Sequence, residues 1–348
     1  PYNSLTGASR WNEPCVPVYT TGTSIDTGGQ PRESLRTVYG RIDQDIDRAI
    51  ELLEKARETT LAENNKSHIN LYVALGIKSR ACLAEGDWDG AFKAAKRVID
   101  EGGYAVGTKS DLTGGMNSLD KQNVMWGAGI QVADQAGGYA GFFTHMDNKE
   151  GAYAKSAPKL ISKQLYNRIS ATDIRRDWWD PSDKESPYVS KKFSFANVAS
   201  FLGDYIYMRV EEMYFTAAEA ALRLDDLKSA RELMNTVMAE RDPGYSANNR
   251  SGTLLGATTT TWTGSFLENI LTHRRIELWG EYGRLFDVRR LGQGIDRRTD
   301  DGFSEECISM MNRRNVNITK ADTYDWVLTI PKAELDANPN INEEDQNP

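Results

Sequence analysis

The stretch that decides the fold spans residues 272–292 and reads THRRIELWGEYGRLFDVRRLG. Five arginines alternate there with three acidic residues, and apolar residues recur among them at helical spacing. The apolar members are Ile276, Leu278, Trp279, Tyr282, Leu285, Phe286 and Val288. A solvated helix face would not need large rings between its charges. The pattern therefore predicts a helix that packs on one side and fixes the following turn with ion pairs, and we expect structural roles for Arg275, Glu277, Arg284 and Asp287.

This stretch resembles a signature of the SusD/RagB family, which comprises surface lipoproteins that bind nutrients at the outer membrane of Bacteroidetes. The family pattern reads roughly ERRxELxxEGxRxFDLxR. The matching positions are Arg274, Arg275, Glu277, Leu278, Glu281, Arg284, Phe286, Asp287 and Arg290. His273 stands where the family usually has Glu, and Tyr282 stands where it has Gly.

A second motif lies near the end of the sequence. Residues 330–339 read IPKAELDANP and residues 346–348 read QNP, which is similar to the C-terminal pattern of the same family. Two independent motifs in the family's order make the resemblance specific. It extends from about residue 32 to residue 348, and the chain resembles the C-terminal two-thirds of a family member.

Helical periodicity recurs along the chain. Apolar residues at three- and four-residue steps predict helices over 32–57, 68–84, 88–100, 205–223 and 226–240. The last four form two pairs, 68–84 with 88–100 and 205–223 with 226–240, that resemble tetratricopeptide repeats. Small residues twelve positions apart occupy the places where such pairs cross closely, namely Ser79 with Ala91 and Ala218 with Ala230.

We therefore expect a mainly α fold of the SusD-like type over residues 1–348, with a loop-rich, partly β region that faces the ligand. The expected parts are a tetratricopeptide-like helical region over 32–101, a loop-rich region over 102–204, a second helical region over 205–292 and C-terminal loops over 293–348.

Composition and motifs narrow the function. The net charge of −8 argues against nucleic acid as a partner, because phosphate binding needs clustered Lys and Arg. No apolar run approaches the length that crosses a bilayer. Three cysteines without CxxC spacing indicate neither a disulfide framework nor a zinc site. Signatures of a catalytic nucleophile, a phosphate-binding loop or a dinucleotide cofactor are lacking, so we expect no enzyme, no metal and no cofactor.

Aromatic residues supply the candidate binding site. One group falls in glycine-rich segments without helical period: Trp126, Tyr139, Phe142, Phe143, Tyr153, Trp178, Trp179, Tyr188, Tyr245 and Trp262. Ring faces suit the flat C–H faces of sugars, and loops over a scaffold often carry binding residues. The candidate ligand-binding residues are Tyr139, Phe142, Phe143, Trp178, Trp179 and Trp262, and the preferred platform is the 132–157 loop. The alternative for each is a locally buried ring that only anchors its loop.

The resemblance implies a surface-exposed lipoprotein of the outer membrane, held by an N-terminal lipid anchor that is absent from this chain. It would capture an oligosaccharide and deliver it to a SusC-like TonB-dependent transporter. Two other hypotheses stay open. A peptide-binding member of the family would present charged pockets in place of an aromatic platform, and a tetratricopeptide scaffold would bind only a protein partner through its helix groove.

Overall fold

Helices dominate the computed structural model, which describes residues 11–20, 22–24, 26–59, 65–132, 141–248, 265–295 and 328–347. The longer helices are α1 (Leu35–Thr59), α2 (Leu71–Glu85), α3 (Trp88–Glu101), α8 (Val210–Arg223), α9 (Leu227–Ala239) and α10 (Phe266–Glu277). The shorter ones are α4 (Lys109–Thr113), α5 (Phe142–Met146), α6 (Ala152–Ser156), α7 (Lys163–Tyr166), α11 (Arg284–Arg290) and α13 (Lys332–Ala337), with 3-10 turns η2 (Ile174–Trp178) and η5 (Glu343–Asp345). The expected mainly α fold is confirmed.

The described strands form two-stranded antiparallel sheets. The pairs are β1 (Pro14–Pro17) with β2 (Arg32–Ser34), β3 (Val124–Ala128) with β6 (Tyr205–Arg209), and β4 (Trp179–Asp180) with β5 (Val189–Ser190). The β3–β6 ribbon leads directly into α8. It therefore joins the loop-rich region to the helical one.

Capping residues set the boundaries of the first helix pair. The Asn70 side chain accepts a hydrogen bond from the Tyr72 backbone N–H at 3.0 Å, and Gly86 ends α2 in the left-handed region with φ of 83°. Asp87 then caps α3 by accepting from the Gly90 N–H at 3.0 Å. The helices predicted over 68–84 and 88–100 thus correspond to α2 and α3.

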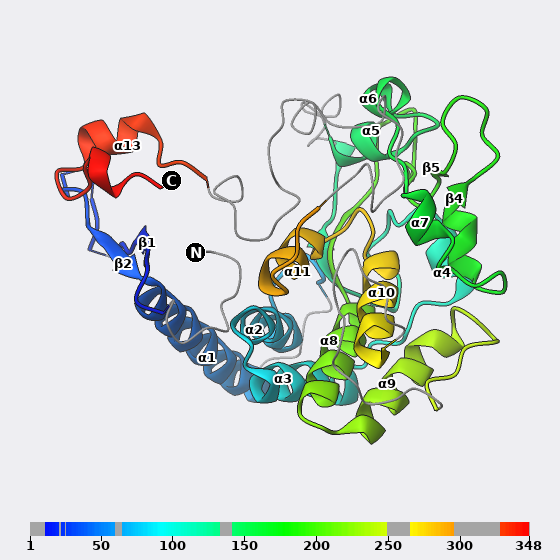
Figure 1. Ribbon diagram of the computed structural model, residues 1–348, viewed down its shortest axis with the longest axis horizontal. Helices are drawn as coiled ribbons and strands as arrows, with labels where there is room; N and C mark the ends of the chain where they lie inside the picture. The colour runs from blue at the N-terminus through cyan, green and yellow to red at the C-terminus, as the bar shows by residue number, and fades with distance from the viewer. Residues whose placement is uncertain are drawn as a thin grey trace.

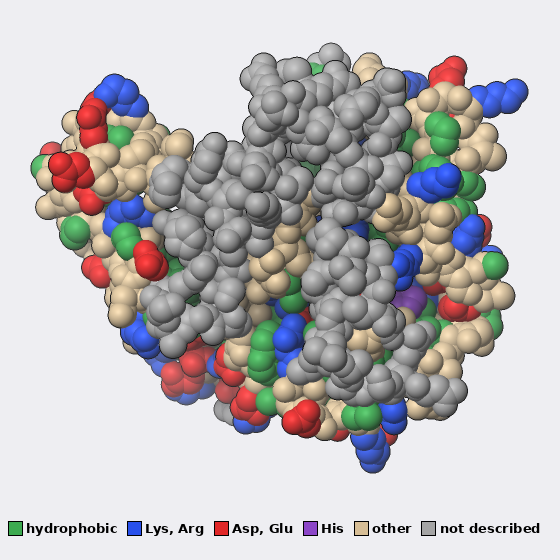
Figure 2. Space-filling model, viewed as in Figure 1, with side chains coloured by type: hydrophobic (Ala, Val, Ile, Leu, Met, Phe, Trp, Pro, Cys, Tyr) green, Lys and Arg blue, Asp and Glu red, His purple; other side chains and the backbone are tan. Residues whose placement is uncertain are grey.

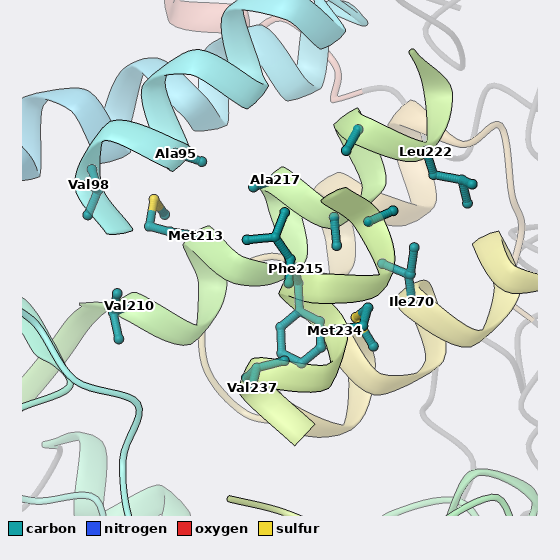
Figure 3. Packing of buried hydrophobic residues seen from close by; sticks show 14 of the residues in the cluster. Ala95, Val98, Val210, Met213, Phe215, Ala217, Leu222, Met234, Val237 and Ile270 are labelled. Carbon is teal, nitrogen blue, oxygen red and sulfur yellow. The ribbon is translucent and has the colours of Figure 1, made fainter. Parts of the chain in front are cut away.

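Close helix crossings occur where the sequence places small residues. Ser79, Ala91, Ala218 and Ala230 each have 0% of their surface exposed. They lie in the α2–α3 and α8–α9 pairs, and α3 packs against α8 to join the two pairs. Figure 3 shows the core that results, with Ala95 and Val98 of α3 and side chains of α9 and α10 around α8.

A second core is built mainly of aromatic rings and lies beneath the loop-rich region. It includes Phe143, Tyr166, Trp178, Trp179, Phe193 and Phe195, together with Ile276 of α10. Ile276 is fully buried, so α10 connects the aromatic core to the helical body. The loop-rich region therefore has a packed interior of its own.

The helix α1 extends from the body to a small lobe that holds β1, β2 and α13 (Figure 1). The lobe brings the two ends of the described chain together. The Arg32 guanidinium donates to the Asp345 carbonyl at 2.9 Å and to the Asn347 side chain at 3.0 Å. Asn338 donates to the Gln30 carbonyl at 2.9 Å. The C-terminal motif seen in the sequence thus fastens this lobe.

Two helix predictions are wrong in part. Residues 205–209, predicted as the start of a helix, form β6, because tyrosines alternate there with Ile206 and Met208 at the period of a strand. Residues 272–292 form two helices with a turn between them, in which Gly280 and Gly283 have φ of 75° and 120°. The short α11 consequently leaves Leu285 and Phe286 exposed by 57% and 53%, although both were expected on the packed side.

Charged side chains of both signs are interspersed over the described part of the face in Figure 2, without a continuous field of one sign. Among the described residues, no helix is long and apolar enough to cross a membrane.

Candidate functional site

The family-like stretch centres on a buried carboxylate, Glu277, at the end of α10. Three arginines from different segments donate to it: Arg175 at 3.1 Å, Arg209 at 3.0 Å and Arg241 at 3.0 Å. All four side chains are fully buried. Charges so far from water are tolerated only when they are paired and hydrogen-bonded. This cluster therefore ties α10 to η2, β6 and the segment after α9.

The cluster controls the ionisation of its members. Burial opposes the charge of Glu277, but Arg241, Arg209 and Arg175 outweigh it and hold the pKa of Glu277 well below its usual range. Lys192 is also completely buried, and its ammonium group donates to the Glu277 and Trp279 carbonyls and to Glu281. Burial lowers the pKa of Lys192 to about 8. Its hydrogen bonds are all directed at the turn before α11, so its role is structural.

His273 is one of the two residues that depart from the family pattern. Its Nδ1 lies 2.9 Å from Nη2 of Arg175. A guanidinium has no acceptor, so Nδ1 must accept this hydrogen bond and the ring must be unprotonated at that nitrogen. The imidazole thus joins the Glu277 cluster as a hydrogen-bond acceptor.

A second group of ion pairs fixes α11 to α8. Arg274 donates to Asp287 at 3.0 Å, and Arg290 donates to Glu219 at 2.6 and 2.7 Å. Of the four residues expected as structural ties, Glu277 and Asp287 belong to these buried groups. Arg275 and Arg284 are only half-buried, and the buried arginines of this stretch are Arg274 and Arg290.

The tryptophan pair of the candidate site lies inside the aromatic core. Trp178 and Trp179 are each 1% exposed, and their rings meet edge to face at 5.8 Å. The indole N–H of Trp178 donates to the Leu112 carbonyl at 2.8 Å. A ring enclosed on all sides offers no face to a ligand. The buried-anchor alternative therefore describes these two residues in this structure.

The phenylalanines of the preferred platform lie in α5. Phe143 is 2% exposed and packs between Phe195 and Tyr205, which corrects the expectation that its ring is exposed. Phe142 is half-buried, and its ring contacts Phe193 edge to face at 5.2 Å. Their burial follows from the second core, which the sequence does not reveal because its members lack a common period. Tyr139 and Trp262 lie outside the described residues.

The same loop nevertheless presents an exposed ring pair, His145 and Tyr153. Their rings are stacked, with centroids 4.5 Å apart and planes only 5° from parallel. Both side chains are exposed, Tyr153 by 38%. His145 comes from α5 and Tyr153 from α6, so the stack depends on how the two helices meet.

The turn between α5 and α6 fixes that arrangement. Asp147 accepts from the backbone N–H of Lys149 and Glu150 and also from that of Phe195, at 3.0, 2.9 and 3.0 Å. Gly151 lies so close to neighbouring carbonyls that a Cβ there would approach one of them to 2.5 Å. The ring pair is thus held on a rigid turn, which lowers the entropy lost when a ligand binds.

A further exposed ring, Phe201, belongs to the same region. It is 47% exposed and stands in the left-handed region with φ of 52°, which is uncommon for a bulky residue. Its ring lies 5.8 Å from Phe195, which in turn contacts Phe143 at 5.7 Å. We call His145, Tyr153 and Phe201 the loop-face surface. His145 and Phe201 were not predicted from the sequence. For His145, the turn from Asp147 to Gly151 was the available signal.

The chemistry of the loop-face surface is that of binding. Its rings can stack against a flat apolar face, and the surrounding backbone can bond hydroxyl groups. Among the described residues, no group of three or more His, Cys, Asp or Glu side chains could hold a metal ion.

Comparisons with known proteins identify the family. The SusD family profile matches residues 145–348, which is more than half of the chain. The chain therefore belongs to the SusD family. A search of curated protein sequences found no match.

Solved structures share the fold over nearly the whole chain. A SusD-like carbohydrate-binding protein from Bacteroides vulgatus is 25% identical, with a TM-score of 0.78 over 99% of this chain and 73% of the other. A SusD superfamily protein from Bacteroides thetaiotaomicron is 22% identical, with a TM-score of 0.74 over 100% and 74%. The surface glycan-binding protein A from Bacteroides uniformis is 18% identical, with a TM-score of 0.63 over 97% and 75%.

Proposed function

We propose that this protein binds oligosaccharides at the cell surface and delivers them to a SusC-like TonB-dependent transporter in the outer membrane. An N-terminal lipid anchor would hold it there, and it would catalyse no reaction. The observation that carries the proposal is the exposed, nearly parallel stack of His145 and Tyr153 in a chain of the SusD family. Support also comes from the B. vulgatus structure, which is described as a carbohydrate-binding protein.

The loop-face surface suits capture and release better than it suits catalysis. His145 and Tyr153 stand on short helices, Phe201 packs against Phe195 of the aromatic core, and the buried carboxylate of Glu277 is held by three arginines. Stacking on exposed rings gives moderate affinity, which allows a ligand to be passed on. Tyr139 and Trp262 stay candidate contacts of this surface.

Calorimetry with oligosaccharides selected on a glycan array tests the proposal. Tyr153→Ala should weaken binding by about 1–3 kcal/mol, because it removes a rigid stacking ring. Tyr19→Ala is the matched control, since it removes another exposed tyrosine from the distant lobe. If a folded Tyr153→Ala protein keeps full affinity, the binding site lies at Tyr139 or Trp262 instead. Binding of peptides in place of every glycan would contradict the proposal itself.

Two further measurements address transport and catalysis. Purification of the tagged protein from detergent-solubilised outer membranes should yield a TonB-dependent transporter identified by mass spectrometry. Incubation with the bound polysaccharide should release no new reducing ends, and turnover abolished by replacing one acidic residue would make the protein an enzyme.

A further inference from the structure

A second set of aromatic rings lies away from the loop-face surface, beside α2 and α11. Trp126 of β3 and Tyr207 of β6 meet edge to face, with centroids 5.1 Å apart. Tyr282, in the turn before α11, is stacked on Phe286 of α11 with centroids 5.0 Å apart. In Figure 1, α11 lies apart from α5 and α6.

Arg80 of α2 links the two ring pairs. Its Nη2 donates to the Tyr207 carbonyl at 2.8 Å, and its guanidinium carbon lies 3.7 Å from the centre of the Tyr282 ring. The same guanidinium is held by Glu212 through hydrogen bonds of 2.8 and 2.6 Å. Arg80 therefore contacts the Tyr207 backbone of one ring pair and the Tyr282 ring of the other. We call Trp126, Tyr207, Tyr282 and Phe286 the aromatic strip.

Packing alone does not account for the aromatic strip. Tyr207 is 42% exposed and Phe286 is 53% exposed, whereas Trp126 and Tyr282 are half-buried. The rings of the second core show what folding does with aromatics in this protein, since Trp178 and Trp179 are 1% exposed. Exposed rings such as Tyr207 and Phe286, gathered beside partly buried ones, are a usual mark of a binding surface.

The polar atoms of the aromatic strip are open as well. Within the described part of the chain, the Tyr207 and Tyr282 hydroxyls and the Trp126 indole N–H make no hydrogen bond to another residue. They are neutral groups, two of which can both donate and accept. Ring faces alternating with neutral hydroxyl groups complement a sugar, which presents C–H faces edged by hydroxyls.

The charge at the aromatic strip selects among sugars. Arg80 lies over the Tyr282 ring of the strip, and its charge is paired with Glu212 through two hydrogen bonds. Arg274, which lies behind Tyr282, is paired with Asp287 at 3.0 Å. An acidic sugar would therefore lose water around its charge without gaining a partner in these contacts, and the net charge of −8 adds repulsion.

We propose that the aromatic strip is a second carbohydrate site, which binds neutral oligosaccharides in preference to uronic-acid-containing or sulfated ones. This inference rests on the proposed function, because it assumes that the protein binds glycans. It adds a location distinct from the loop-face surface and a class of ligand. With two separated surfaces, one chain of sugar could contact both, and its affinity would exceed that of either contact alone.

The test uses calorimetry on the whole chain with two sets of probes. The neutral probes are oligosaccharides of β-glucan, mannan and xylan, and the acidic probes are oligogalacturonate and chondroitin sulfate. Phe286→Ala and Tyr207→Ala should each weaken binding of the neutral ligand about tenfold, the effect of one lost stacking ring. Leu224→Ala is the control, since it removes an exposed apolar side chain at the end of α8. Affinity for a neutral ligand should not change with salt concentration.

The outcomes separate the two proposals. Full neutral-glycan affinity in both strip variants, confirmed as folded by circular dichroism, would overturn this inference and leave glycan binding intact. Preferred, salt-sensitive binding of an acidic probe that the strip variants abolish would also overturn it, because the charge argument would be wrong. Failure of the wild-type protein to bind any glycan would instead refute the proposed function, and this inference with it.

Discussion

The body around α8 and the extended helix α1 both contain apolar side chains and ion pairs. These side chains are buried in the body and at least partly exposed along α1. Twelve of the fourteen residues of α8 are buried, whereas none of residues 35–56 of α1 is. The ion pairs differ in the same way. Those around Glu277 are closed off from water, while Glu51 of α1 meets Arg48 and Lys55 in full contact with it. The comparison teaches that an ion pair or an apolar stripe has no fixed value, since burial sets its contribution to stability.

The largest effect should come from Glu277→Ala. Removing this carboxylate leaves three buried arginines facing one another without their shared partner, at a cost of about 3–5 kcal/mol in unfolding free energy. Urea denaturation followed by tryptophan fluorescence measures it. A loss below about 1 kcal/mol would mean that water reaches the Glu277 cluster, as it reaches the ion pairs of α1.

Replacing an isoleucine by alanine should lower the unfolding free energy more in the body than in α1. Ile270 of α10 is 0% exposed, and Ile270→Ala should cost about 2–5 kcal/mol. Ile46 of α1 is half-buried, and Ile46→Ala should cost roughly 1 kcal/mol because less of its surface leaves water on folding. Equal losses in the two variants, measured in the same urea titration, would break the comparison.

The pH dependence should have opposite signs in the two regions. Arginines hold the pKa of Glu277 far below its ordinary value, so its contribution to stability is complete above that value and is lost as pH falls. At the α1–α2 junction, burial and the charges of Asp43 and Asp87 raise the pKa of Glu85 to about 7. Ionisation of Glu85 therefore costs stability as pH rises through 7.

Unfolding free energies measured across the pH range check both signs. We expect a steep fall below about pH 4, where carboxylates paired with arginine take up protons. Glu85→Gln should remove a shallow decline between about pH 4.5 and pH 7, the range in which only the unfolded chain has Glu85 ionised. A decline that persists unchanged in Glu85→Gln would assign it to another group.

The smallest effect should come from Glu51→Ala. Lys55 and Arg48 lower the pKa of Glu51 to about 2, yet this carboxylate is fully exposed and salt screens its pairs. We expect an unfolding midpoint indistinguishable from that of the wild-type protein. A clear loss of stability would show that surface pairs on α1 hold the lobe to the body.

The same contrast explains what the sequence could predict. The helix pairs followed from apolar periodicity, because a helical period is set by residues three and four positions apart. The Glu277 cluster could be anticipated only as a set of ties, since Arg175, Arg209 and Arg241 reach it from distant segments. The candidate binding site was harder to predict than the Glu277 cluster. Phe143 and Trp178 stand in segments without period, and only the three-dimensional fold shows that one core encloses both. The exposed stack of His145 and Tyr153 likewise depends on the turn between two short helices.

The lobe at the far end of α1 has a consequence for biosynthesis. Arg32 contacts Asn347 across 315 positions, and Asn338 contacts Gln30 across 308. A ribosome makes the chain from the N-terminal side, so β1 and β2 emerge long before the residues that complete their lobe. Until then this strand pair lacks the contacts that Asn338 and Asn347 make with Gln30 and Arg32.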